Sequence, residues 1–331
     1  MIEALLELDR LKNSKNLLAF SAGVDSSALF FLLQSLNIKI DLALINYQTR
    51  ATSNDEEEFA KELGREFGVR VFTTKAPKFQ SDFENRAREF RYNFFEEIID
   101  EQNYQNLLTA HHLGDRLEWF FMKLIRGAGV VELLGMEPKE VRFTKSGKSY
   151  NLIRPLLNLT KDELLEFLRG GNYRYFIDES NFDSKFERNF IREKFANPLL
   201  RNYQDGIKRS FEYLTKDRNY LSSCFELKTQ IKDLAVFELK DKECLDRAVN
   251  SYLKRFNLKL SKREREILKI QDSLIVARRW AVGLRDKKTL FIAPFFQTNL
   301  PKKFKEECRV AKIPPKIRPY LYTQNISPRE L

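Results

Sequence analysis

The chain has 331 residues, of which 43% are hydrophobic and 32% are charged, a composition typical of globular proteins. Its apolar runs fall far short of the roughly 20 residues of a membrane-spanning helix, and its first residues lack the basic head and apolar run of a secretory signal. Three scattered cysteines, Cys224, Cys244 and Cys308, provide no disulfide framework and suit a reducing compartment. These features argue against a membrane protein and predict a cytoplasmic one.

The net charge of +11 is distributed unevenly along the chain. Residues 201–331 hold 30 Lys and Arg against 16 Asp and Glu, a net charge of +14, whereas the preceding residues have a net charge of −3. A basic second part joined to a weakly acidic first part favours contact of the second part with a polyanion such as nucleic acid. A basic face that is merely solvated is the alternative.

Short apolar segments alternate with helical patterns over the first 126 residues. Strands are predicted at 16–21, 40–46, 69–73 and 106–110, and helices at 26–36, 53–67, 82–102 and 117–126. A capping box of Ser53 and Glu56 is expected to open the second helix. This alternation predicts βαβ units and a doubly wound α/β fold with a mostly parallel sheet. Such sheets bind ligands beyond the carboxyl ends of their strands.

The remaining residues change character along the chain. Residues 137–150 are polar and basic, which predicts an exposed loop, and Thr160 with Glu163 predicts the start of a capped helix. Residues 185–225 have a mostly helical pattern, and β-branched runs from about residue 270 predict a small α+β module. The predicted parts are a catalytic domain, a helical linker and a small basic α+β domain, at 1–205, 206–265 and 266–331.

A loop with the sequence SAGVDSS, residues 21–27, joins the first predicted strand to the first helix. The free N–H groups at a helix start bind anions, and Gly23 lets the backbone approach a phosphate closely. Hydroxyl donors are available from Ser21, Ser26 and Ser27. Asp25 would repel a bare phosphate, so it is expected to hold Mg²⁺ or to brace the loop. The loop has neither a Walker A lysine nor G-x-G-x-x-G spacing, and an ordinary capped turn is the alternative.

The only two histidines, His111 and His112, follow the fourth predicted strand. On helical spacing, Asp115 and Glu118 share a face near the next helix start, where two carboxylates would form a pocket for a cationic amine. A zinc site is not expected, because it needs three or four ligands and no cysteine precedes Cys224. Two structural histidines at a strand end are the alternative.

Both segments resemble motifs of one enzyme family. LLAFSAGVDSSAL is similar to the S-G-G-x-D-S loop of the PP-loop ATP pyrophosphatases, which cleave ATP between its α and β phosphates and adenylate a substrate. AHHLGDRLEW, followed by LIRGAG and Gly135-Met136, resembles blocks of the tRNA(Ile)-lysidine synthetases. Further blocks in that family's order are ENRAREFRY, RPLL, DESN, RNFIR and the tail KKFKEECRVAKIPPKIRPYLY. The resemblance covers residues from about 15 to 322.

The sequence departs from the family pattern at several positions. Ala22 replaces the usual middle glycine of the loop, which is tolerable if its φ angle stays below zero. Tyr47 stands where the family usually has histidine, although Arg50 and Ser53 remain. Three further departures, from aspartate, glutamine and threonine, are Gly114, Arg116 and Trp119.

The resemblance implies formation of lysidine at the wobble cytidine of the tRNA(Ile) that has a CAU anticodon. The cytosine 2-carbonyl oxygen attacks the α-phosphorus of ATP, pyrophosphate leaves, and the ε-amine of free L-lysine then displaces AMP at C2. ATP and Mg²⁺ are the expected substrate and metal. The expected partners are tRNA(Ile) and lysine, with no obligatory protein partner.

The resemblance also suggests roles for individual residues. Arg88 and Arg91 are expected to neutralise phosphate charge, and Asp25 to be catalytic as a Mg²⁺ ligand. Asp115 and Glu118 are expected to bind lysine, with Asp115 as the base that removes its proton. Expected ATP contacts are Ser21, Ala22, Gly23, Val24, Asp25, Ser26, Ser27 and His111. Expected tRNA contacts are Arg188, Arg192, Lys302, Lys303, Lys305 and Arg318. An interdomain salt bridge is the alternative role of Arg188 and Arg192.

Three other functions are compatible with parts of the sequence. A tRNA thiolase on the same fold needs cysteines beside the ATP site, and no cysteine precedes Cys224. An amidotransferase-type synthetase needs a glutaminase and gives no reason for a basic second part. A non-catalytic RNA-binding protein could retain a nucleotide-binding relic, but the intact Asp25, Asp115 and Glu118 argue against it.

Overall fold

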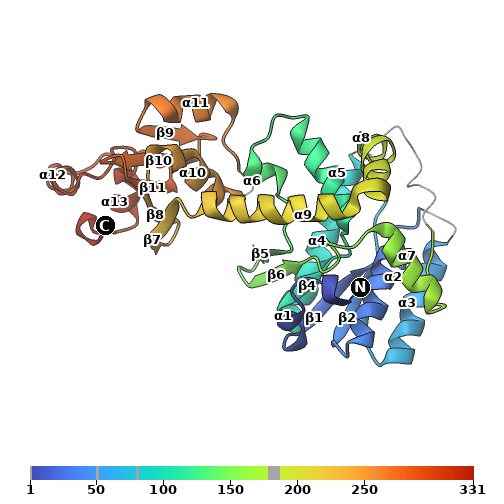
Figure 1. Ribbon diagram of the computed structural model, residues 1–331. Helices are drawn as coiled ribbons and strands as arrows, with labels where there is room; N and C mark the ends of the chain where they lie inside the picture. Colours follow the sequence, from blue (N-terminus) through green and yellow to red (C-terminus); the bar gives the residue numbers. More distant parts are fainter. Residues whose placement is uncertain (1, 50–51, 80–81, 178–186, 257) are drawn as a thin grey trace. The chain divides into compact units, whose positions relative to one another are not determined.

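The computed structural model describes residues 2–49, 52–79, 82–177, 187–256 and 258–331. The chain forms two compact units, Met1–Thr215 and Lys216–Leu331 (Figure 1). Helix α9, Asn197–Ser222, begins in the first unit and ends in the second, so the boundary lies within the stretch predicted to be helical. In the described ranges, no helix is long and apolar enough to cross a membrane.

A mostly parallel sheet forms the centre of the first unit (Figure 1). Its strand order is β3-β2-β1-β4-β6-β5, with β5 antiparallel to β6 and the other neighbours parallel. The strands are β1 Asn16–Phe20, β2 Ile40–Asn46, β3 Val71–Lys75, β4 Asn106–Leu108, β5 Lys139–Phe143 and β6 Ser149–Ile153. This arrangement confirms the predicted doubly wound α/β fold.

Helices connect these strands along the chain. In chain order they are the 3-10 turn η1 Ile2–Ala4, α1 Leu8–Lys12, α2 Val24–Ser35, α3 Ser53–Phe67, α4 Phe83–Gln102, α5 Leu113–Leu124, α6 Val130–Leu133, α7 Lys161–Gly170, α8 Glu187–Ile191 and the π-helical turn η3 Arg192–Ala196. The predicted helices at 26–36, 53–67 and 82–102 correspond to α2, α3 and α4.

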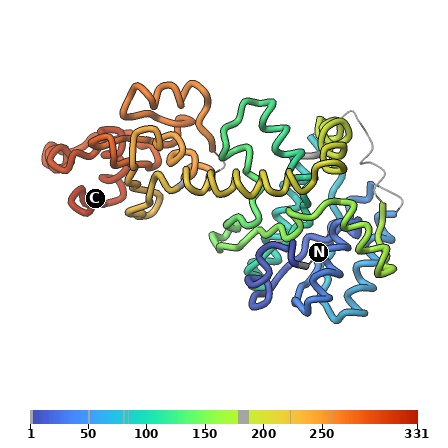
Figure 2. Tube along the Cα trace, viewed as in Figure 1, coloured from blue at the N-terminus to red at the C-terminus, as the bar shows by residue number. Residues whose placement is uncertain are grey.

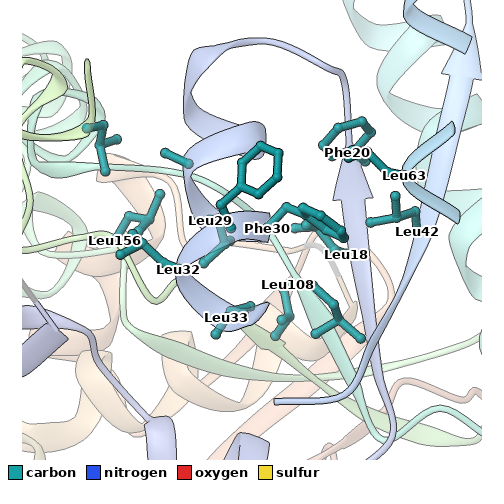
Figure 3. Packing of buried hydrophobic residues seen from close by; sticks show 14 of the residues in the cluster. Leu18, Phe20, Leu29, Phe30, Leu32, Leu33, Leu42, Leu63, Leu108 and Leu156 are labelled. Atoms are coloured by element: carbon teal, nitrogen blue, oxygen red, sulfur yellow. The ribbon is translucent and has the colours of Figure 1, made fainter. Parts of the chain in front are cut away.

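Neighbouring residues of a strand direct their side chains to opposite faces of this sheet, so both faces are apolar. One face packs against α2 and α3, and Figure 3 shows that contact through Leu18, Phe20, Leu29, Phe30, Leu42 and Leu63. The other face packs against α4, whose Phe95 and Ile99 contact a cluster that includes Leu17 and Leu107. Burial on both faces explains why these strands are almost entirely apolar.

The polar segment 137–150 is not the exposed loop that the sequence predicts. β5 and β6 form an antiparallel hairpin, and its turn contains Gly147 at a φ angle of 91°. β6 also pairs with β4, which buries Tyr150 and Leu152. The prediction failed because β5 is an edge strand, where charged residues are common and conceal the strand pattern.

The helix starts differ in how well the sequence predicts them. Thr160 and Glu163 form the expected capping box of α7. The expected box of Ser53 and Glu56 is wrong, because the residue at the cap of α3 is Thr52. Helix α5 begins at Leu113, four residues before its predicted start, because His112 caps it.

An antiparallel sheet with strand order β7-β8-β11-β10-β9 forms the centre of the second unit. Its strands are β7 Phe225–Ile231, β8 Leu234–Leu239, β9 Ser273–Val276, β10 Trp280–Arg285 and β11 Thr289–Pro294. Its helices are η4 Lys242–Cys244, α10 Leu245–Leu253, η5 Lys254–Phe256, α11 Lys262–Ile270, α12 Lys302–Val310, α13 Arg318–Thr323 and η6 Pro328–Glu330. Buried clusters lie on both faces of the sheet, and the trace in Figure 2 follows the chain through it.

Two expectations for residues after 205 differ from the structure. The predicted helical linker at 206–265 contains the strands β7 and β8 in addition to helices. Cys224 and Cys244, expected to be unpaired, form a disulfide with their Cα atoms 5.9 Å apart, while Cys308 is free and buried. Sequence spacing could not predict this pair, because the two cysteines are 20 residues apart and lie beyond the paired ends of β7 and β8, Phe225 and Leu239.

Gly283 of β10 lies directly under the turn before α13, where an added Cβ would collide with Pro314. We expect Gly283→Ala to lower the free energy of unfolding by about 1–3 kcal/mol, as overpacking does. Gly206, which is exposed on α9, has no atom near an added Cβ, so Gly206→Ala should raise that free energy by about 0.5–1 kcal/mol. Urea unfolding of the two variants measures both changes in free energy. Equal stability of Gly283→Ala and Gly206→Ala would contradict the close packing of Gly283 against Pro314.

Candidate active site

The two sequence motifs meet at one edge of the first sheet. The SAGVDSS loop follows β1 and the HHLGD segment follows β4, and β1 pairs in parallel with β4. From β1 the chain continues to β2 and β3 on one side, and β4 then returns to the other side of β1. Their shared edge is therefore the topological switch point, where doubly wound sheets bind ligands.

Hydroxyl groups of the loop hold it in a fixed shape before any phosphate binds. Ser21 N–H donates to Ser26 Oγ over 3.2 Å, and Ser27 Oγ donates to the Ala22 carbonyl oxygen over 3.2 Å. From beyond α7, Phe176 N–H donates to the same carbonyl over 2.9 Å. The loop then leads into α2, whose first turn offers its N–H groups at the switch point.

Alanine at position 22 was expected to be tolerable if its φ angle stayed below zero, and this condition is not met. Its φ angle is +59°, in the left-handed region that favours glycine, and its side chain is fully buried. An L-residue in this region is less stable by roughly 1–2 kcal/mol than in an ordinary conformation. The loop therefore keeps the conformation that a glycine would adopt, and alanine is the smallest side chain that strains it.

A lysine that the sequence analysis missed contacts the loop carboxylate. Lys161 Nζ lies 2.7 Å from Asp25 Oδ1, and His112 Nε2 lies 4.0 Å from the same oxygen. Lys161 is the first residue of α7, where the helix dipole disfavours a cation. A lysine in this unfavourable position, directly after the Thr160 cap, was the feature of the sequence that could have indicated a functional role for Lys161. The structure thus supplies, from a distant helix, the cation that the loop itself lacks.

The two histidines have different roles. His112 Nδ1 accepts the N–H of Gly114 over 3.0 Å, and Asp115 Oδ2 accepts the N–H of His112 over 2.9 Å. This exchange caps α5, and a Cβ on Gly114 would lie 2.6 Å from the His112 ring, which explains the glycine at this position. His111 is partly buried, with its Nδ1 at 2.9 Å from Thr109 Oγ1.

Asp115 and Glu118 form one buried acidic site, as predicted, and it binds guanidinium groups in this structure. Arg188 Nη2 contacts Asp115 Oδ1, and Arg188 Nε lies 2.7 Å from Glu118 Oε2. Arg192 Nε lies 2.6 Å from Glu118 Oε1. The Glu118 side chain is 1% exposed, so removal of either arginine would be destabilising.

The protonation of Asp115 bears on its expected role as a base. Burial alone would raise the pKa of Asp115, but the nearby Arg188 guanidinium and the hydrogen bond from the His112 N–H favour the carboxylate, and the pKa lies below its usual range. A carboxylate with a lowered pKa binds a cation well and removes a proton poorly. The geometry thus favours Asp115 as an anchor for a positive group.

The arginines of α4 lie apart from the phosphate loop in the described residues. Arg91 Nε donates to Tyr47 Oη over 3.1 Å, and the Arg88 guanidinium lies 5.0 Å from the centre of the Tyr92 ring. Neither arginine forms a hydrogen bond or ion pair with residues 21–27. Tyr47, which departs from the family pattern, therefore fixes the position of Arg91.

The departures on α5 contribute to packing. Arg116 Nη2 donates to Thr215 Oγ1 over 3.1 Å, and its guanidinium lies 4.4 Å from the centre of the Phe211 ring, which joins α5 to α9. Trp119 Nε1 donates to the Glu132 carbonyl oxygen over 3.0 Å, which joins α5 to α6. These residues support the helix that carries the acidic site.

Four of the six basic residues predicted to bind RNA lie on two elements of the second unit, whereas Arg188 and Arg192 lie in the first unit at the acidic site. Lys302, Lys303 and Lys305 are exposed on α12, and no ion pair with another described residue occupies them. Arg318 begins α13, and its Nε donates to the Ile313 carbonyl oxygen over 2.8 Å. The DESN block and Arg50 lie outside the described residues.

No group of three or more metal-binding side chains occurs in the described part of the chain. Mg²⁺ in nucleotide enzymes is commonly bound by one or two carboxylates together with substrate phosphates and water. Asp25, at the start of α2, supplies one such carboxylate. The chain's own residues therefore fit Mg²⁺ as a companion of a bound polyphosphate and do not form a closed metal cage.

Burial of His111 has a consequence for stability at acidic pH. Burial lowers the pKa of His111 from 6.5 to about 4, so the unfolded chain takes up a proton that the folded chain excludes. Stability therefore falls as the pH drops below 6.5 and levels off near 4. Between about pH 7 and about pH 5, the wild-type chain should lose about 2 kcal/mol more unfolding free energy than His111→Gln. Urea unfolding at both pH values checks this, and parallel losses would contradict a buried neutral His111.

Comparison with known proteins agrees with this geometry. Residues 2–199 match the family model described as PP-loop domain. A tRNA(Ile)-lysidine synthase of Campylobacter jejuni (strain RM1221) is 45% identical over 316 residues, which cover 96% of this chain and 95% of that protein. One of Wolinella succinogenes is 41% identical, covering 97% of each chain.

Among solved structures, the U34-tRNA thiolase NcsA of Methanococcus maripaludis superposes with a TM-score of 0.50 at 18% identity, covering 65% of this chain and 77% of that one. At this identity the likeness bears on the fold alone. The match of the first unit to the PP-loop model and the nearly full-length match to the curated relatives lead to one conclusion. The chain belongs to the tRNA(Ile)-lysidine synthase family of PP-loop proteins.

Proposed function

We propose that this protein uses ATP to ligate free L-lysine to C2 of the wobble cytidine in the tRNA(Ile) with a CAU anticodon. The observation that carries the proposal is the meeting of two dissimilar sites at one edge of a sheet. A helix-start loop suited to phosphate lies beside a buried pair of carboxylates suited to a cationic amine. A cytoplasmic location is part of this proposal.

The first step is adenylation of the cytosine. Its 2-carbonyl oxygen attacks the α-phosphorus of ATP, and the bond to the bridging oxygen of pyrophosphate breaks. The N–H groups at the start of α2 and the ammonium of Lys161 lie where the leaving phosphates would bind. Preorganised donors and cations stabilise the charge that develops on a leaving group. Arg88 and Arg91 remain candidates for neutralising phosphate charge on the side of the nucleotide that faces away from the loop.

Mg²⁺, when bound with the nucleotide, supplies positive charge to the phosphates. Asp25 is the residue that would hold it. Asp25 also contacts Lys161, so the carboxylate holds the lysine beside the loop. Loss of Asp25 removes both functions.

The second step is attack of the lysine ε-amine on C2, with departure of AMP. Asp115 and Glu118 would bind the positive groups of lysine, and their present contacts with Arg188 and Arg192 support a site that prefers cations. Arg188 and Arg192 would then contact the adenylate or the RNA. Asp115 would anchor the lysine, and its lowered pKa makes it a weak base for the amine proton.

The basic second unit would hold the tRNA by phosphate contacts. Its α12 lysines are exposed, and such contacts position an RNA without reading its sequence. Reading of the anticodon requires unstacked bases, which the switch-point crevice could accept. The second unit would thus position the tRNA, and the first unit would carry out the reaction.

Two other functions remain distinguishable by experiment. A thiolase is disfavoured because no cysteine precedes Cys224, and Cys224 is paired with Cys244. A non-catalytic RNA-binding protein would not need the Asp25–Lys161 pair or the buried carboxylates. Turnover of ATP would exclude that function.

Lysine incorporation tests the proposal directly. Purified protein, ATP, labelled lysine and tRNA(Ile) with a CAU anticodon should give labelled tRNA and pyrophosphate. Asp25→Ala and Lys161→Gln should each lower the rate by about 100-fold or more, as the loss of a group that stabilises charge in the transition state does. Arg174→Gln is a matched control, because Arg174 forms an exposed ion pair with Glu62 on the same unit.

The products separate the alternatives. Pyrophosphate without labelled tRNA would keep the adenylation step and reject lysine as the nucleophile. No pyrophosphate with any tRNA would reject the proposal in favour of a binding protein. A normal rate for Lys161→Gln would reject the role of Lys161 alone.

The α12 lysines give a second prediction. We expect the triple variant Lys302→Gln, Lys303→Gln, Lys305→Gln to bind tRNA more weakly, because fewer lysine–phosphate pairs release fewer counterions from the RNA. The slope of log affinity against log salt should become shallower by about one for each lysine that had paired with a phosphate. Filter binding at several salt concentrations measures this, and ATP binding serves as the control that should not change. An unaltered slope would place the RNA elsewhere.

A further inference from the structure

The segment that follows α7 reaches the middle of the phosphate loop through its main chain. Helix α7 ends at Gly170, and six residues later Phe176 forms an isolated parallel bridge with Gly23. Phe176 N–H donates to the Ala22 carbonyl oxygen over 2.9 Å. A residue far from the loop in the sequence therefore contacts the loop at the position that departs from the family pattern.

Aromatic packing holds this segment in place. The Tyr173 ring stacks on Phe31 of α2, with ring centres 4.0 Å apart and an angle of 14° between the ring planes. The Phe176 ring lies against Phe59 of α3, with ring centres 5.8 Å apart. Phe31 and Phe59 both belong to the buried core of the first unit. The main chain of Phe176 is therefore fixed by the core.

The Ala22 carbonyl oxygen has two donors. Phe176 N–H approaches it over 2.9 Å, and Ser27 Oγ approaches it over 3.2 Å. The Ala22 carbonyl and the Gly23 N–H belong to one planar trans peptide group, so they point in opposite directions. Within the described residues, no acceptor pairs with the Gly23 N–H. The bond from Phe176 thus directs a free N–H of the loop away from the segment after α7.

This peptide group would not keep its orientation through the preference of its own residues. Ala22 has a φ angle of +59°, which an L-residue leaves for negative φ when nothing opposes the change. Such a change would turn the peptide group between Ala22 and Gly23. Packing around the buried Ala22 methyl group and the two hydrogen bonds to its carbonyl oppose it.

We propose that Phe176 is a positioning residue for nucleotide binding. Its main-chain N–H holds Ala22 in the left-handed conformation, so that the Gly23 N–H is directed at a phosphate of ATP. Phe176 acts through Ala22 and touches no substrate. The inference rests on the proposed use of ATP. A glycine at position 22 would adopt this conformation readily, so the need for Phe176 follows from the alanine.

The test removes the N–H of residue 176 in the full-length chain. We expect Phe176→Pro to weaken binding of ATP with Mg²⁺ roughly tenfold in isothermal titration, because a buried carbonyl loses its donor and the loop can relax. Lys145→Pro is the matched control, since Lys145 is exposed at the second position of the hairpin turn closed by Gly147 N–H and the Thr144 carbonyl oxygen. Equal ATP affinity of the two proline variants would overturn the proposal.

A change at position 22 separates positioning from a general effect on folding. In the Ala22→Gly background, Phe176→Pro should weaken ATP binding by less than about threefold, because glycine is not strained at positive φ. A purely structural role of Phe176 would give the same loss of affinity in both backgrounds. Equal losses would therefore reject the positioning role.

A second variant decides the question if Phe176→Pro does not fold. Insertion of the α-hydroxy analogue of phenylalanine at position 176 replaces the N–H with an ester oxygen and keeps the aromatic ring. Weaker ATP binding by this chain, restored by Ala22→Gly, would support the proposal. ATP affinity equal to that of the wild-type chain would overturn it.

Lysine incorporation by the wild-type chain is measured in parallel. Loss of ATP affinity in Phe176→Pro and its recovery with Ala22→Gly, without lysine incorporation by the wild type, would support the role of Phe176 and reject the proposed reaction. Normal incorporation with equal ATP affinity in Phe176→Pro and Lys145→Pro would reject the role of Phe176 and leave the proposed reaction intact. A wild-type chain that binds no ATP would reject both.

Discussion

The parallel pairing of β1 with β4 is the constraint on which the candidate site depends. The register sets Asn16 beside Asn106 and Leu18 beside Leu108, so the two strands end at the same edge. Asn106 Nδ2 donates to Asn16 Oδ1 over 2.8 Å in the buried centre of this pair, and an unpaired amide there would be costly. A shift of one residue would turn every apolar side chain to the opposite face. The pairing therefore places the phosphate loop and the acidic site side by side, with His112 Nε2 4.0 Å from Asp25 Oδ1 and 3.6 Å from Asp115 Oδ2.

Much of the first unit could be predicted from the sequence because its signals are local. The βαβ alternation, the bounds of β2 and α3 and the Thr160–Glu163 cap depend on residues that are near one another in the chain. The site was predicted only in part. Asp25, Asp115 and Glu118 lie where the motifs indicated, but Lys161 and Phe176 reach the loop from more than 130 residues away, and no spacing rule encodes such contacts. The left-handed Ala22 was missed for a different reason, since its conformation is imposed by the packing around a buried methyl group.

Charge is handled differently in the two units. In the first unit, guanidinium groups neutralise the carboxylate of Glu118 at almost no exposure, an arrangement that is stable only while every partner is present. In the second unit, Arg285 and Arg318 are instead oriented by hydrogen bonds to main-chain oxygens.

The contact between Asp25 and Lys161 also constrains how the sequence can change over time. A lysine at the first position of α7 opposes the helix dipole, so without Asp25 it would be a liability. A carboxylate at the start of a phosphate loop would repel its ligand without the lysine. Each residue thus makes the other tolerable, and neither can be replaced first without a loss. We therefore expect substitutions at positions 25 and 161 to occur together, because a substitution at either position alone would be unfavourable.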